Sequence, residues 1–105
     1  IKRSGEIVQF VPFRERAWHA GQSNYMGREC CNDFSIGIEL EGSDTDLFED
    51  NQYRQLDLLI AALQKAYPQI AANITGHSDI APGRKTDPGT GFDWNRLNNG
   101  GKGVV

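Results

Sequence analysis

The sequence predicts a small α/β domain in which a helix packs against a β-sheet. Residues 34–41 alternate apolar and polar side chains with the period of a strand. Residues 53–67 instead repeat apolar side chains at helical spacing. With 105 residues, 38% of them hydrophobic, the chain has enough apolar surface for one modest core. We therefore expect a single domain over residues 1–105, without internal repeats.

The first expected element is a β-hairpin at the N-terminus. Ser4-Gly5 is suited to a two-residue turn, and residues 6–11 alternate as a second strand would. Only three residues precede this turn, and the chain begins at Ile1 without an initiator Met. Because a six-residue strand normally pairs with one of similar length, we expect that upstream residues are missing.

The alternating segment is the clearest predicted strand. Its apolar face consists of Phe34, Ile36, Ile38 and Leu40, and its polar face of Ser35, Gly37, Glu39 and Glu41. The residues between the hairpin and this strand, from Gln22 to Asn32, have no regular pattern. We expect an irregular stretch there.

A helix should follow, with an apolar stripe that packs on the sheet and ends at Pro68. The stripe consists of Tyr53, Leu56, Leu59, Ile60, Leu63 and Tyr67. Residues 74–77 are expected to form a short strand or its end. Asp93 is expected to cap a brief last helix through Leu97, before a glycine-rich tail over residues 100–103.

Charge and hydropathy exclude some classes of partner. The formal net charge is −3, and Lys and Arg are scattered along the chain, so we expect no nucleic-acid partner. No apolar run approaches the roughly 18 residues of a membrane span, so we expect no membrane partner either. Cys30 and Cys31 are adjacent and should not form an ordinary disulfide, which is weak support for a reducing compartment.

The segment from Gly76 to Gly89 has the layout of a metal site. His77 and Asp87 are good ligands for zinc, and Pro82-Gly83 can turn the loop so that the two side chains converge. Lys85 could then present its ammonium group to a developing oxyanion beside the metal.

Three motifs in register, at residues 18–21, 32–42 and 76–89, resemble the zinc-dependent N-acetylmuramoyl-L-alanine amidases. The resemblance is closest to the AmpD-type enzymes of cell-wall recycling, and a wider kinship includes phage T7 lysozyme and the peptidoglycan recognition proteins. It implies an α/β fold with a mixed central β-sheet flanked by helices. The chain would be the C-terminal portion of one amidase domain, without the upstream strand and the first zinc ligand.

The same resemblance implies the site residues. His77 and Asp87 match two of the three ligands of Zn²⁺, and the first histidine ligand has no counterpart in this sequence. Glu39 matches the residue that handles protons, and Lys85 the residue that stabilises the transition state. Trp18, His19, Asn32 and Arg84 align with positions in or near the substrate groove, and His19 does not bind zinc in the family.

The implied function is hydrolysis of the amide bond between 1,6-anhydro-N-acetylmuramic acid and L-alanine of the stem peptide. The expected partner is therefore a muropeptide, and we expect a cytoplasmic monomer. Two alternatives stay open: a non-catalytic peptidoglycan-binding module and a lytic phage or secreted amidase. With two metal ligands, this chain should bind zinc weakly unless upstream polypeptide supplies the third.

Each site residue also has a simpler interpretation. His77 could be a hydrogen-bonded histidine at a strand end, and Asp87 part of an Asx turn. Lys85 could be a solvated surface residue, and Trp18 could be buried in the core. The remaining candidates are by default surface or turn residues: Glu39, Asn32 and Arg84. The sequence leaves open which muropeptides are preferred and whether the two cysteines have any role.

Overall fold

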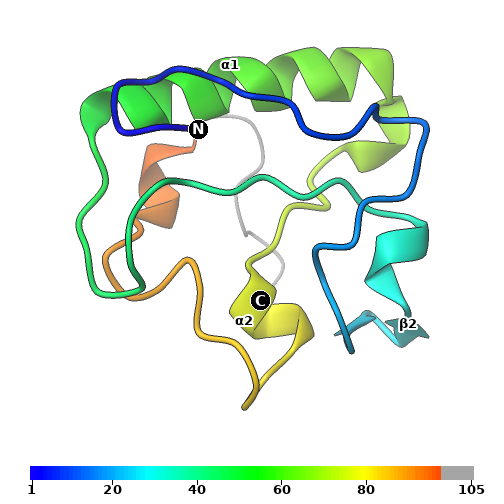
Figure 1. Ribbon diagram of the computed structural model, residues 1–105. Helices are drawn as coiled ribbons and strands as arrows, with labels where there is room; N and C mark the ends of the chain where they lie inside the picture. The colour runs from blue at the N-terminus through cyan, green and yellow to red at the C-terminus, as the bar shows by residue number, and fades with distance from the viewer. Residues whose placement is uncertain (98–105) are drawn as a thin grey trace.

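The computed structural model describes residues 1–97, and helices are its main regular elements. In chain order these are β1 (Asn24–Tyr25), β2 (Arg28–Glu29), η1 (Cys31–Asp33), α1 (Asp50–Ala66), η2 (Pro68–Ile70), α2 (His77–Ile80) and η3 (Trp94–Arg96). Helix α1 lies along one side of the molecule, and α2 with the loop that follows it lies on the opposite side (Figure 1).

Helix α1 confirms the helix predicted from the apolar stripe. Tyr53, Leu56, Ile60 and Leu63 are buried along one face. The first turn is capped because the backbone N–H of Glu49 donates to the side-chain oxygen of Gln52, at 2.9 Å. The helix ends before Pro68, as expected, because proline cannot supply the next backbone donor.

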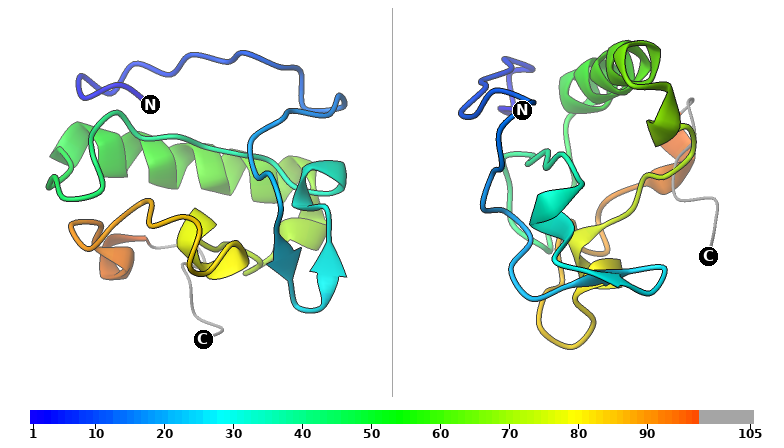
Figure 2. Two further views of the ribbon diagram at one scale, coloured as in Figure 1. Left: turned by 60° about the horizontal axis from the view of Figure 1, so that its bottom comes forward. Right: turned by 90° about the vertical axis from the view of Figure 1, so that its right-hand side faces the viewer.

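The core lies between α1 and the segments that cross beneath it (Figure 2). Phe92 joins the buried face of the helix, and its ring packs edge-on against Trp94 with centroids 4.8 Å apart. Six further side chains are partly buried against this cluster: Ile1, Leu40, Phe48, Ile74, Trp94 and Leu97. Aromatic side chains therefore join the C-terminal turn η3 to α1.

The predicted strand over residues 34–42 is not a regular strand in the structure. Residues 35–40 carry no strand assignment, although Leu40 reaches the core. Within residues 1–97, this segment is hydrogen-bonded to the N-terminal residue Ile1. The N-terminal amino group of Ile1 donates to the Glu39 carbonyl, and the Ile1 carbonyl accepts from the Glu41 amide. Alternation decides which side chains face the core, but a strand also needs a neighbour along its whole length.

The other predicted strands differ from the structure in the same way. A turn forms near Ser4-Gly5, but its loop has three residues, 3–5, instead of the predicted two: the Gly5 amide donates to the Lys2 carbonyl at 2.8 Å, and the Lys2 amide donates to the Glu6 carbonyl at 2.9 Å. Residues 6–11 carry no strand assignment, and Phe10 is 86% exposed. His77 opens a helix instead of ending a strand. Within residues 1–97 the regular sheet is the antiparallel β1–β2 pair, so the mixed central sheet is not seen there.

Asp93 caps the last short helix as predicted. Its side chain accepts a hydrogen bond of 3.0 Å from the Asn95 amide, and the turn η3 that follows is a 3₁₀ helix. The predicted glycine-rich tail lies outside the described residues. Among residues 1–97, no helix combines the length and apolar character that a membrane crossing requires.

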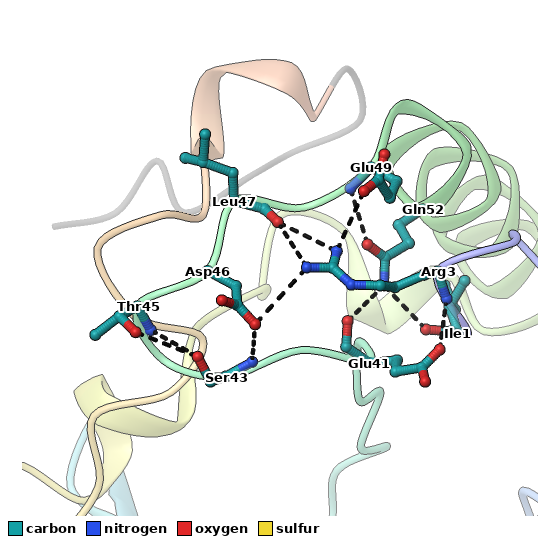
Figure 3. Close-up of polar contacts among 9 residues, drawn as sticks. All are labelled: Ile1, Arg3, Glu41, Ser43, Thr45, Asp46, Leu47, Glu49 and Gln52. Atoms are coloured by element: carbon teal, nitrogen blue, oxygen red, sulfur yellow. Dashed lines mark hydrogen bonds and ion pairs between the residues drawn. The ribbon is translucent and has the colours of Figure 1, made fainter.

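Polar contacts of Arg3 fix the loop that leads into α1 (Figure 3). Both terminal nitrogens of the guanidinium donate to the Leu47 carbonyl at 3.2 Å. The same group pairs with Asp46 at 3.7 Å and with Glu49 at 3.5 Å. This arrangement holds residues 43–49 in place from the N-terminal side.

The opposite side of that loop packs against the segment that contains Asp87. A Cβ atom placed on Gly89 would lie 1.8 Å from the Asp44 carbonyl oxygen, and one on Gly91 would lie 1.9 Å from that of Asp46. The Thr86 hydroxyl also donates to the Asp44 carboxylate. The 43–49 loop therefore supports the candidate metal loop directly.

Candidate metal centre

Helix α2 and the turn after it bring the two ends of the metal loop together. His77 is the first residue of α2, and the amide of Ala81 donates to its carbonyl at 3.0 Å, which closes the helical turn. Gly83 then adopts φ +80°, a left-handed conformation suited to glycine. The Ser78 amide donates to the Asp87 carbonyl at 2.9 Å, so the loop returns to its starting point.

The structure brings His77 and Asp87 together. His77 Nδ1 lies 3.1 Å from Asp87 Oδ2. The His77 side chain is 18% exposed and that of Asp87 is 46% exposed, so the pair opens to solvent on the carboxylate side. The proximity expected from the Pro82-Gly83 turn is therefore observed, and the role of the pair as metal ligands stays a prediction.

The other ring nitrogen of His77 determines which tautomer is present. His77 Nε2 lies 2.8 Å from the Ala20 carbonyl oxygen. Because a carbonyl can only accept, Nε2 carries a proton, and in the neutral ring Nδ1 has a lone pair that faces the carboxylate. Two acceptors this close need a proton or a cation between them.

A zinc ion fits this arrangement. Zinc ligands bound tetrahedrally at about 2.0–2.2 Å lie roughly 3.3 Å apart, which is close to the observed separation of the two atoms. A metal-binding histidine also normally donates its second N–H to a carbonyl or carboxylate, as His77 does to Ala20. The residues present therefore fit two of the positions around a zinc ion.

A third donor is not found nearby. Within residues 1–97, no group of three His, Cys, Asp or Glu side chains is placed to hold a metal ion. Both cysteines are free, as expected, with Cys31 buried and Cys30 exposed. The chain therefore offers a pair of donors in its described part.

Asn32 holds the backbone next to His77. Its side-chain oxygen accepts from the amides of His19 and Ala20, at 2.9 and 2.8 Å. This amide oxygen therefore fixes the segment that presents the Ala20 carbonyl to His77. A contact between Asn32 and substrate stays a prediction.

His19 lies against the extended segment that carries Glu39. Its Nε2 is 3.3 Å from the Ser35 hydroxyl, which itself donates to the Cys31 carbonyl at 2.6 Å. A Cβ atom on Gly37 would lie 2.7 Å from the ring, so only glycine allows this packing. Burial lowers the pKa of His19 below its ordinary value.

Arg84 binds the same backbone segment as His77. Its Nη2 donates to the carbonyls of Ala20 and Gln22, at 2.6 and 2.7 Å. A Cβ atom on Gly21 would lie 2.9 Å from this nitrogen, so the absence of a side chain there permits the approach. Arg84 is an exposed residue, as its simpler interpretation has it, but its guanidinium is bound to the backbone, and a contact with substrate stays a prediction.

The other predicted site residues are exposed. Trp18 is 80% exposed, with the Arg16 guanidinium 5.2 Å from its ring centroid, so its interpretation as a core residue is wrong. Glu39 and Lys85 are also exposed. Within residues 1–97, neither side chain makes a hydrogen bond or ion pair with His77 or Asp87, so their catalytic roles stay predictions.

A pocket of about 410 Å³ lies beside Arg84 and Gly21. It is lined by Gly21, Gln22, Ser23, Asn24, Glu29, Cys30, Ile80, Ala81, Pro82 and Arg84. The β1–β2 hairpin and the turn after α2 therefore form its walls.

No pattern in the sequence predicted the role of the Ala20 carbonyl, which both His77 and Arg84 contact. This carbonyl accepts hydrogen bonds from His77 and Arg84, which lie 57 and 64 positions further along the chain. Because every residue has a backbone carbonyl, the residue type at position 20 does not indicate such a role. Gly21, the next residue, is the one feature that could have indicated a close approach to this backbone. The shared acceptor became visible only in the folded chain.

A histidine and an aspartate that converge on one loop, with the second histidine nitrogen held by a carbonyl, are a pair of donors of the kind found in zinc sites. The chain belongs to the N-acetylmuramoyl-L-alanine amidase family, whose model matches residues 1–90.

Curated relatives support this assignment. The chain is 67% identical over 97 residues to 1,6-anhydro-N-acetylmuramyl-L-alanine amidase AmpD of Escherichia coli, covering 92% of this chain and 53% of that protein. It is 57% identical to the protein of the same name from Haemophilus influenzae, covering 91% and 53%. The chain thus spans about half the length of the curated relatives it matches.

Solved structures show the same kinship. The crystal structure of a selenomethionine derivative of AmpD superposes with a TM-score of 0.88 at 65% identity, over 90% of this chain and 53% of that one. AmiD from E. coli, in complex with anhydro-N-acetylmuramic acid-L-Ala-D-γ-Glu-L-Lys, gives a TM-score of 0.80 at 40% identity, over 88% and 39%. The arrangement of the described segments is therefore that of the family.

Proposed function

We propose that this chain is part of a zinc-dependent amidase that cleaves the bond between 1,6-anhydro-N-acetylmuramic acid and L-alanine of the stem peptide. Family membership supports the class of reaction. The names of the relatives and the substrate bound to AmiD support the choice of an anhydromuropeptide. The observation that carries the proposal is the separation of 3.1 Å between His77 Nδ1 and Asp87 Oδ2.

The metal would be held by His77 Nδ1 and the Asp87 carboxylate. A zinc ion with an open position supplies a water whose pKa falls to about 7 and polarises the scissile carbonyl. The Glu39 carboxylate takes the proton from the attacking water and delivers it to the departing alanine nitrogen. The Lys85 ammonium neutralises the oxyanion that develops on the carbonyl oxygen.

The glycopeptide would lie on the surface next to this pair. Exposed Trp18 offers a flat apolar surface against which part of the ligand would pack. His19 precedes Ala20 in the chain, and Asn32 accepts from the amides of both, so we place these two residues beside the ligand as well. A cytoplasmic monomer that acts in cell-wall recycling is the setting that we propose.

The third zinc ligand and the mixed central sheet belong to the same proposal. A catalytic zinc normally has three protein ligands, and residues 1–97 bring two donors together. We therefore assign the third ligand to polypeptide outside these 105 residues. Added strands there would also give residues 35–41 the pairing partner that they need along their length.

A non-catalytic peptidoglycan-binding module is the second candidate. The observation that favours it is that residues 1–97 bring together two candidate metal ligands, whereas a catalytic zinc normally has three. Such a protein would bind muropeptides and leave them intact. A lytic or secreted amidase would share the chemistry proposed here and differ in its substrate.

The test is to measure zinc content and the release of stem peptide from 1,6-anhydromuropeptide by the intact protein. We expect Glu39→Gln and Lys85→Ala to retain zinc and to lose turnover by on the order of a hundredfold. Glu41→Gln, on the same face as Glu39, and Lys65→Ala, on α1, are the matched controls and should keep wild-type turnover.

Each outcome separates the candidates. Unchanged turnover in Glu39→Gln or Lys85→Ala would remove that residue from the mechanism. Binding of muropeptide without zinc and without hydrolysis would favour the binding module. Hydrolysis of intact cell walls in preference to anhydromuropeptides would favour the lytic enzyme.

A further inference from the structure

The carbonyl of Ala20 is shared by two side chains from the metal loop. His77 Nε2 donates to it at 2.8 Å, and Arg84 Nη2 donates at 2.6 Å. Ala20 itself is 1% exposed, and both bonds are partly buried. A guanidinium has donor N–H groups but no acceptor atom, and it stays protonated in proteins. Arg84 can therefore only donate to the Ala20 carbonyl.

Arg84 therefore fixes where this carbonyl points. Its Nη2 also donates to the Gln22 carbonyl at 2.7 Å, so one nitrogen joins two backbone acceptors that flank Gly21. On the other side of the segment, Asn32 accepts from the Ala20 amide at 2.8 Å. The backbone around Ala20 is thus held from both sides, and the direction of its carbonyl fixes the imidazole of His77.

The position of Arg84 is itself built into the metal loop. The amide of Arg84 donates to the Ala81 carbonyl at 3.1 Å, and the Ala81 amide donates to the His77 carbonyl at 3.0 Å. The guanidinium thus returns from the end of this turn to the carbonyl that His77 uses. A closed ring of contacts results, from His77 through α2 to Arg84 and back through Ala20.

We propose that Arg84 is a positioning residue for His77, acting through the shared Ala20 carbonyl. It keeps the His77 Nε2–H donated to that oxygen and so keeps Nδ1 turned toward Asp87. The inference rests on the proposed zinc site. The inference goes beyond the proposed zinc site because it gives Arg84 the role of orienting a metal ligand, in place of contact with the glycopeptide.

The experiment measures zinc affinity by chelator competition, together with kcat and KM for 1,6-anhydromuropeptide, in the intact protein. Removing a hydrogen-bond partner that orients a metal ligand typically costs tenfold to a hundredfold in metal affinity. We expect Arg84→Ala to weaken zinc binding by about tenfold or more. At saturating zinc, KM should stay within about twofold of wild type, because the guanidinium does not bind substrate.

Further variants keep the test decisive if Arg84→Ala fails to fold. Gly21→Ala should also weaken zinc binding, because the new Cβ would lie 2.9 Å from Arg84 Nη2 and displace it. Arg84→Lys should give an intermediate zinc affinity, since a single ammonium can reach a carbonyl but lacks the planar fork. Arg54→Ala, an exposed arginine on α1, removes the same charge and is the control expected to bind zinc normally.

The outcomes separate this inference from the proposed function. Unchanged zinc affinity with a raised KM in Arg84→Ala would overturn the inference and make Arg84 a substrate contact. Unchanged zinc affinity in Arg84→Lys and Gly21→Ala would overturn it as well. A wild-type protein that binds no zinc would overturn the proposed metal site, and the inference with it.

Discussion

At the scale of single residues, backbone carbonyls and glycines place the side chains of the candidate site. Ala20 supplies the acceptor for His77, and Gly37 leaves the space in which the His19 ring packs. Each of these roles depends on a main-chain atom or on the absence of a side chain. Substitutions beside the candidate ligands should therefore perturb the site as strongly as changes to polar side chains.

His19 should make the folded protein less stable as the pH falls. Burial lowers its pKa in the folded protein below the ordinary value of 6.5. As the pH falls through that value, the unfolded chain takes up a proton that the folded protein does not. The unfolded state then binds more protons, so the free energy of unfolding decreases over this window.

The measurement is urea unfolding of the metal-free protein between about pH 7.5 and about pH 5.5, above the range in which most carboxylates titrate. We expect His19→Gln to flatten the decline seen in the wild type, because the amide can still donate to Ser35 but does not titrate. If the variant kept the wild-type slope, the titration of His19 would not be its cause.

At the scale of elements, the sequence predicted the helices and turns that depend on residues close together in the chain. The stripe from Tyr53 to Tyr67 predicted α1, because every hydrogen bond of a helix lies within the helix itself. The cap at Asp93 was also predicted correctly, and the N-terminal turn was predicted at nearly the right place, with a loop one residue too short. These features depend on residues a few positions apart.

Pairing between distant segments could not be predicted in this way. The alternation of residues 34–41 is that of a strand, yet most of this segment has no partner strand within residues 1–97. The meeting of His77 and Asp87 was predicted because a single loop joins them. The bonds of both His77 and Arg84 to Ala20 cross more than half of the chain and left no pattern in the sequence.

Gly89→Ala should disturb the contact between the 43–49 loop and the metal loop. The new Cβ would lie 1.8 Å from the Asp44 carbonyl oxygen, so one of the two backbones must move. Asp87 lies two residues away, and we expect zinc affinity to fall by about tenfold as its carboxylate shifts. Chelator competition in the intact protein measures this change.

Gly27→Ala is the matched control for backbone strain. Gly27 has φ +88° and Gly89 has φ +85°, but a Cβ on Gly27 meets nothing within 4 Å. Both variants should lose about 1 kcal/mol or more of stability from the left-handed conformation. Only Gly89→Ala should also lose zinc affinity, and equal affinities in the two variants would contradict the proposed support of the metal loop.

At the scale of the whole molecule, the core and the candidate site occupy opposite sides. Helix α1 and the aromatic cluster around Phe92 form the core, whereas His77 and Asp87 lie where α2 and its loop return (Figure 1). The site depends on contacts among loops, with little buried apolar surface of its own. A bound metal ion should therefore contribute to the stability of this side of the molecule.

Zinc should stabilise a longer polypeptide more than the isolated 105-residue chain. A ligand that binds only the folded state adds about 2.7 kcal/mol to the free energy of unfolding at a concentration 100 times its Kd. If the third zinc ligand lies outside these residues, the same free zinc concentration will be far below the Kd of the isolated chain. Urea unfolding with buffered zinc or with chelator, for both lengths, measures the difference.

His77→Ala in each length is the control, because it removes one of the two donors and should abolish the zinc-dependent increment in both. A large increment in the longer polypeptide and a small one in the isolated chain would support an external third ligand. Equal increments that both disappear in His77→Ala would mean that residues 1–105 complete the zinc site themselves. An increment that survives His77→Ala would place the metal elsewhere and contradict the pairing of His77 with Asp87 on which the proposed chemistry depends.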